Sequence, residues 1–137
     1  MKKTIAIAAA MLLAAVVIYG VIRLEIGGPE HQLARAIEKE ASKAREAGTA
    51  VYLKDHTDFA WDKAYIFGSY TGPRTINTAL GYHWTDQYLS NDDADRIIVF
   101  CDKGKVVRHI LYSGWMSNDS NDLYARPLSR EEAVIWP

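Results

Sequence analysis

The side chains in this sequence that could do acid–base or metal chemistry are four histidines and several aspartates. The histidines are scattered, with neither H-x-x-x-H nor H-E-x-x-H spacing, at His31, His56, His83 and His109. His56 shares one polar turn with Asp58, and His83 stands between two aromatic residues. A small hydrolase would need such a histidine with an orienting carboxylate, either Asp58 or Asp62. Turn chemistry and ordinary packing explain the same residues without catalysis.

Complete catalytic or metal-binding motifs are missing from the sequence. It contains no G-x-S-x-G, P-loop or G-x-G-x-x-G pattern. Asn91, Asp93 and Asp95 have the alternate spacing of calcium-loop ligands, but Arg96 stands where the turn glycine belongs. Cys101 is the only cysteine, and its apolar neighbours favour a buried, inert thiol. We therefore assign no catalytic residue, no metal and no cofactor, and leave enzymatic activity open.

Aromatic residues suggest a different activity, the binding of a partner surface. Four tryptophans and eight tyrosines are many for 137 residues. Several fall at the ends of expected elements or in loops, where aromatic rings are typical of binding surfaces. The candidate binding residues are Trp61, Tyr70, Tyr82, Trp84 and Trp115. The alternative interpretation is that these rings belong to the core.

The elements that position these residues are organised around residues 61–71, which read W-D-K-A-Y-I-F-G-S-Y-T. A strand over residues 59–67 is predicted to lead through Gly72 and Pro73 into a short helix that ends at Gly81. Alternation along this strand puts apolar side chains on both faces, so we expect it to be a central strand.

The clearest local signal is a hairpin of residues 96–101 and 105–112, rich in β-branched and aromatic residues. Asp102-Lys103-Gly104 joins the two strands, and the glycine is placed for the left-handed conformation of a bulged hairpin. A further strand is predicted over residues 49–54, and a polar loop over residues 117–122.

Two further helical segments are predicted. Residues 30–47 carry a thin apolar stripe at helical spacing and end at Gly48. Such a helix lies across a sheet or serves as a spacer. Near the C-terminus, Ser129 and Glu132 fit a capping box, which predicts a last helical turn.

The N-terminal segment has the composition of a membrane anchor. Residues 4–22 carry no charged side chain, and a stretch of this length can cross a bilayer as a helix. Lys2 and Lys3 favour a cytoplasmic N-terminus, and therefore a folded domain outside the cytoplasm. A cleaved signal peptide usually has a shorter apolar core and small residues before the cut. We therefore predict an uncleaved signal-anchor over residues 1–26, with a cleaved signal and a soluble buried helix as alternatives.

Length and charge limit the class of protein. A chain of 137 residues has room for one domain. Without Lys2 and Lys3 it carries 14 Lys and Arg residues against 17 Asp and Glu residues, a net charge of −3, which argues against a nucleic-acid-binding surface. The expected fold is α+β: a transmembrane helix, a long amphipathic helix and a small, mostly antiparallel sheet with a short helix. The expected parts are an anchor over residues 1–26, the amphipathic helix over 27–48 and an extracytoplasmic domain over 49–137.

The central motif, the glycine-terminated helix and the run I-I-V-F-C-D-K-G-K-V-V together resemble a group of small uncharacterised Gram-negative envelope proteins. Those proteins look like W-D-x-x-Y-x-F-G-x-Y-T followed by an L-V-F-x-x-x-G-K-V-V hairpin, and the similarity spans residues 59–112. The helix-then-hairpin order is also loosely similar to the small lipoproteins of outer-membrane assembly, although the lipid-anchor cysteine is missing. The resemblance implies a scaffold or interaction role and carries over no catalytic residue.

These observations predict a membrane-tethered, extracytoplasmic protein-interaction module of the bacterial cell envelope, of accessory, scaffold or inhibitor/immunity type. It would cross the inner membrane once, with its C-terminal domain in the periplasm and another envelope protein as its partner. The alternative is a small envelope hydrolase that uses a His/Asp pair. Clustering of those side chains in one cleft would favour the enzyme, and dispersal would favour the binding module.

Overall fold

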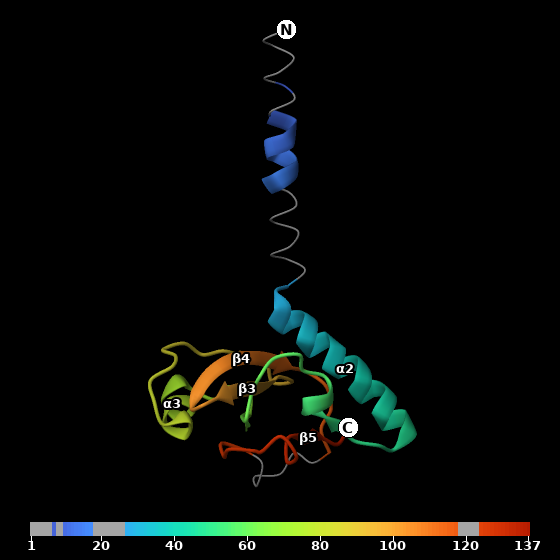
Figure 1. Ribbon diagram of the computed structural model, residues 1–137, viewed down its shortest axis with the longest axis vertical. Helices are drawn as coiled ribbons and strands as arrows, with labels where there is room; N and C mark the ends of the chain where they lie inside the picture. The colour runs from blue at the N-terminus through green and yellow to red at the C-terminus, as the bar shows by residue number, and fades with distance from the viewer. Residues whose placement is uncertain (1–6, 8–9, 18–26, 118–123) are drawn as a thin grey trace.

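The computed structural model describes residue 7 and residues 10–17, 27–117 and 124–137 (Figure 1). It has an α+β fold with helices and two small antiparallel sheets. Residues 10–17 are helical. Among the described residues, no helix is long and apolar enough to cross a membrane. Most of the anchor predicted over residues 1–26, and all but the first residue of the loop predicted over 117–122, lie outside the described residues.

Helix α2 (Pro29–Ala47) confirms the predicted amphipathic helix. Proline at its first turn suits the helix start, and Gly48 ends it with φ of 67°, in the left-handed region that favours glycine. Its buried residues lie on one stripe at helical spacing: Ala34, Ile37, Ala41 and Ala44. The three alanines in this stripe let α2 pack closely along β4 (Lys105–Tyr112) and β1 (Val51–Tyr52), so α2 covers one face of the sheet.

The main sheet has the strand order β2-β3-β4, with β2 at Lys63–Phe67 and β3 at Arg96–Asp102. The expectation that the strand before Gly68 is central is wrong, because β3 is the central strand and β2 lies at an edge. The reason is the apolar run of β3, which is buried on both faces. The outer edge of β2 is covered instead by Leu128, which exchanges backbone hydrogen bonds of 2.9 and 2.8 Å with Ala64.

The two faces of this sheet have separate cores. The face under α2 is built on alternate residues of the hairpin, which include Ile98, Phe100, Ile110 and Tyr112. The opposite face is covered by α3 (Pro73–Leu80), whose Ile76 packs on Ile97, Val99 and Cys101. As predicted, α3 starts after Gly72 and ends at Gly81, where φ is 79°.

The predicted hairpin is confirmed, but its turn differs in detail. Asp102 pairs with Lys105, so the loop has two residues, Lys103 with φ of 52° and Gly104 with φ of 79°. Two consecutive positive φ values define a type I′ turn, whose twist matches the flanking strands. The bulge lies inside β4, where Val107 is the extra residue between the pairs Cys101–Val106 and Phe100–Arg108.

Gly104→Val is expected to lower the free energy of unfolding by about 1–2 kcal/mol, because a β-branched residue is strained at positive φ. A side chain there would meet no atom within 4 Å, so the backbone conformation alone sets the cost. Urea unfolding measures it. Gly104→Asn is the control and should lose much less, since asparagine tolerates this conformation. An unchanged urea midpoint for Gly104→Val would show that the turn is wrong.

The strand predicted over residues 49–54 is shorter than expected. Only β1 pairs, with β5 (Val134–Ile135), and the chain then enters a 3₁₀ turn, η1 (Leu53–Asp55). The predicted capping box is confirmed, because the Glu132 amide donates to Ser129 Oγ at 3.2 Å and the Ser129 amide donates to Glu132 Oε2 at 2.9 Å. It holds a single turn, closed by the Ala133 amide on the Ser129 carbonyl, that leads into β5.

Candidate functional site

Trp61 belongs to the core and not to a binding surface. Its side chain is only 3% exposed, its indole N–H donates to Thr57 Oγ1 at 2.8 Å, and its ring meets Phe100 edge-on at 5.1 Å. The Arg130 guanidinium lies 4.7 Å from the ring centre. The alternation expected over residues 59–67 does not reach Trp61, because β2 starts only at Lys63. The indole therefore turns to the α2 side of the sheet.

Tyr82 and Trp84, both half-buried, hold the loop after α3 against the sheet. The Tyr82 hydroxyl accepts a hydrogen bond from the Val106 amide at 2.7 Å, and the Lys105 ammonium lies 4.1 Å from the ring centre. Trp84 packs on the α3-side core and meets the His109 ring edge-on at 5.3 Å. These contacts give both rings a structural role.

Tyr70 and Trp115 are exposed, by 52% and 64%, at one end of the main sheet. They follow the last residues of β2 and β4, which both end beside the start of β3. Trp115 lines a hollow together with Asp93, and a hydrogen bond with Asp93 raises the pKa of the Tyr70 hydroxyl. These two rings are the members of the predicted set that remain available to a partner.

Sequence reasoning missed two further exposed aromatic residues. Trp136 and Tyr52 are 48% and 41% exposed. The Trp136 carbonyl accepts hydrogen bonds from the amide and hydroxyl of Ser117, two residues beyond Trp115. Tyr52 pairs with Val134 of β5, and Trp136 follows the end of that strand. We call Tyr52, Trp115 and Trp136 the aromatic surface. The available signal was the alternation of Val134 and Trp136 around buried Ile135.

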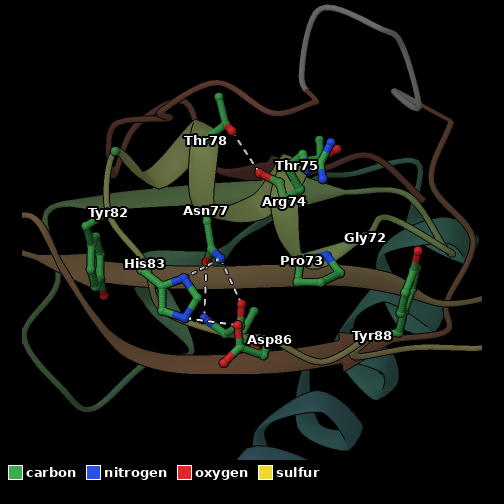
Figure 2. A pocket seen from close by; sticks show the side chains of 12 residues that line it. Gly72, Pro73, Arg74, Thr75, Asn77, Thr78, Tyr82, His83, Asp86 and Tyr88 are labelled. Atoms are coloured by element: carbon green, nitrogen blue, oxygen red, sulfur yellow. Dashed lines mark hydrogen bonds and ion pairs between the residues drawn. The ribbon is translucent and has the colours of Figure 1, made fainter.

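The largest hollow described here lies beside α3 and has a volume of about 880 Å³. Figure 2 shows Tyr82 and Tyr88 at its two ends, with His83 and Asp86 between them. His83 Nε2 and Asp86 Oδ1 are 3.0 Å apart, and both side chains are exposed. Asp86, three residues after His83, is the partner that sequence reasoning missed, and it replaces the proposed Asp62 or Asp58.

Asn77 organises this hollow and was also missed. Its amide oxygen accepts hydrogen bonds from the amides of Trp84 and Thr85, at 2.9 and 3.1 Å. Its amide nitrogen donates to the Thr85 carbonyl at 2.8 Å and lies 3.4 Å from His83 Nδ1 (Figure 2). Asn77 therefore lies beside one ring nitrogen of His83 and Asp86 beside the other.

The other histidine–aspartate pairs considered for a hydrolase are separated or unconnected. Asp62 lies just before β2, where its amide donates to the Cys101 carbonyl, and it lines none of the hollows described here. His56 and Asp58 share a hollow with Arg108, but no hydrogen bond or ion pair joins them in the described part of the chain. Of the predicted pairs, His56 and Asp58 therefore line one hollow without a direct bond, whereas Asp62 is separated from both histidines.

The other side chains that could react or bind a metal ion are buried or isolated from one another. Burial raises the pKa of the Cys101 thiol to about 11, which keeps it protonated at neutral pH and agrees with the predicted inert thiol. Burial also lowers the pKa of His109. Within residues 27–117 and 124–137, no three His, Cys, Asp or Glu side chains are grouped to hold a metal ion.

No protein-family model, curated protein or solved structure matches this chain. The resemblance to Gram-negative envelope proteins therefore stays a prediction.

Proposed function

We propose that this protein is a membrane-tethered protein-interaction module of the bacterial cell envelope, with its folded domain outside the cytoplasm. The observation that carries the binding role is Trp115, a large ring that is 64% exposed on a fixed main chain. Its carbonyl accepts a hydrogen bond from the Tyr112 hydroxyl at 3.2 Å, and Tyr112 itself is fully buried. The main chain that carries the ring is therefore already ordered, so less conformational entropy is lost when a partner covers it.

The surroundings of Trp115 support the same role. Arg45, in the last turn of α2, places its guanidinium 5.9 Å from the indole centre. Tryptophan, tyrosine and arginine are the residues that most often dominate binding energy at protein interfaces. Trp136 and Tyr52 are exposed as well, and the Trp136 carbonyl is hydrogen-bonded to Ser117, two residues beyond Trp115. We infer that a partner protein covers the aromatic surface and that Arg45 lies at its rim.

The membrane part of the proposal rests on the sequence. Residues 4–22 are uncharged and follow Lys2 and Lys3, the pattern of a signal-anchor whose C-terminal domain lies in the periplasm. The partner would then be another envelope protein, and this chain an accessory, scaffold or inhibitor of it.

The test combines photo-crosslinking with affinity measurement. A photo-reactive phenylalanine analogue in place of Tyr52 should crosslink one envelope protein in intact membranes. With that partner purified, Trp115→Ala should weaken binding by at least about 1 kcal/mol, roughly fivefold, while the domain stays folded. Tyr88→Ala is the matched control, because Tyr88 is equally exposed, by 61%, but lies in the α3 hollow.

Two outcomes would count against the proposal. Equal losses for Trp115→Ala and Tyr88→Ala would remove the aromatic surface as the binding site. The mass of the intact protein extracted from the same membranes tests the anchor. A species that lacks about 20 N-terminal residues would exclude a retained anchor, though not the extracytoplasmic location.

A further inference from the structure

Besides the aromatic surface, the outer edge of β4 could also bind a partner, because it carries backbone groups that no strand among the described residues pairs with. β4 is the last strand in the order β2-β3-β4, so every second residue points its backbone N–H and C=O away from the sheet. Side chains cap this edge at both ends. The Val106 amide donates to the Tyr82 hydroxyl at 2.7 Å, and the Ser113 amide donates to Glu38 Oε1 at 3.1 Å.

The pairing shows which residues between the caps point outward. The backbone N–H and C=O groups of Ala64 in β2 both bond to Leu128, so they point away from Phe100, its neighbour in β3. Phe100 must then bond to Arg108 of β4. The direction of the backbone groups alternates along β4 from Arg108. Those of Ile110 therefore also point toward β3, whereas those of His109 and Leu111 point away from the sheet. The Ser113 cap gives the same alternation from the other end.

The outward N–H groups of His109 and Leu111 have no hydrogen-bond partner among the described residues. Beside them lies a hollow of about 200 Å³, lined by Glu30, His31 and Ala34 of α2 and by residues 109–111 of β4. The first turns of α2 therefore leave space along this stretch of the edge. Natural proteins usually cover, charge or bend such an edge, because it is a template for another strand.

We propose that this edge of β4, between Val106 and Ser113, binds an extended segment of the partner protein as a fourth strand of the main sheet. The inference rests on the proposed function, that the protein binds another protein, and names how part of that partner is held. The N–H and C=O groups of His109 and Leu111 provide four backbone hydrogen bonds to an antiparallel or parallel strand. The hollow beside Ala34 receives one side chain of that strand.

A segment of another protein fits this edge better than a second copy of the same chain. Two copies that pair through β4 would put their edge strands about 4.8 Å apart. Helix α2 packs on β4 and has no comparable contact with β3 or β2, so both copies of α2 would lie close to the symmetry axis. Packed helices need about 8–10 Å between their axes, which this arrangement does not leave.

The experiment uses the full chain in detergent and a library of random 12-residue peptides displayed on phage. Selected peptides should slow hydrogen exchange at the His109 and Leu111 amides, which exchange quickly in the free protein while the Arg108 and Ile110 amides are protected. N-methylation of the peptide at successive positions should abolish binding at alternate residues only. That period of two is the signature of an added strand.

A variant of the protein tests the same point. Leu111→Pro removes an outward N–H that the sheet does not use, so the domain should stay folded and peptide affinity should fall about tenfold or more. Leu111→Ala, which shortens the same side chain but keeps the amide, separates loss of the donor from loss of the side chain. If Leu111→Pro does not fold, the N-methyl series on wild-type protein decides the question.

The results separate this inference from the proposed function. Failure to select any peptide, binding that does not alternate with N-methylation, or protection confined to Trp115 would overturn the strand-addition site. So would dimerisation through β4 in sedimentation experiments. If Trp115→Ala loses the crosslinked partner while Leu111→Pro keeps it, the edge is not used and the proposed function stands. If both variants keep the partner, both proposals fail.

Discussion

Trp61→Ala is expected to lower the free energy of unfolding by about 3–5 kcal/mol, the range for removing a large aromatic side chain from a core. The indole is 3% exposed, packs edge-on against Phe100 and lies under the Arg130 guanidinium. Its removal leaves a cavity on the α2 side of the sheet and also unpairs the Thr57 hydroxyl from the indole N–H. A domain of this size has about 5–15 kcal/mol of stability in total, so the variant should be close to unfolding.

Chemical denaturation of the two tryptophan variants in parallel measures this effect. Trp115→Ala is the control, because its ring is mostly exposed and its loss should change stability by less than about 1 kcal/mol. A Trp61→Ala variant as stable as wild type would contradict the core assignment and would return Trp61 to the set of candidate binding residues.

Asn77→Ala is expected to cost about 2–3 kcal/mol and to release the loop after α3. The amide group of Asn77 makes four polar contacts with residues 83–85, and no other described side chain replaces them. Net hydrogen-bond contributions are about 1 kcal/mol each, and part-buried groups left unpaired add to the loss. The amides of Trp84 and Thr85 should therefore exchange with solvent quickly in the variant.

Thr78→Ala is the neighbouring control for Asn77→Ala. Among the described residues, the Thr78 hydroxyl bonds only to the Arg74 carbonyl within α3. Alanine is also the better helix former, so stability should stay within about 0.5 kcal/mol of wild type. Slow exchange at Trp84 and Thr85 in Asn77→Ala would show that the packing of Trp84 on the sheet holds this loop, and that the amide network is secondary.

The two proposed contact regions are continuous along the chain. Ser113, which ends the capped stretch of the β4 edge, lies two residues before Trp115, the centre of the aromatic surface. A segment added along β4 would therefore lead directly to the exposed indole. One partner that contacts both regions would gain affinity both from backbone pairing and from burial of the ring.

Local rules in the sequence were enough to predict the helices and the hairpin. Pro29 and Gly48 bound α2, and Gly104 forms the turn of the hairpin, because restricted or positive φ values are properties of single residues. The capping box at Ser129 was likewise predicted, since its two hydrogen bonds join residues three apart. Burial of Cys101 followed from the apolar run around it.

Only the tertiary structure decided which strand is central, which face Trp61 takes and which groups surround His83. β2 carries apolar residues on both faces, but it pairs with β3 on one side only, and Leu128, far along the chain, covers its other edge. The side of the sheet that Trp61 faces depends on where pairing with β3 begins. The outward amides of His109 and Leu111 follow from a bulge and a strand order. Each of these features is set by pairing between distant segments, and residue type and spacing do not encode such pairing locally.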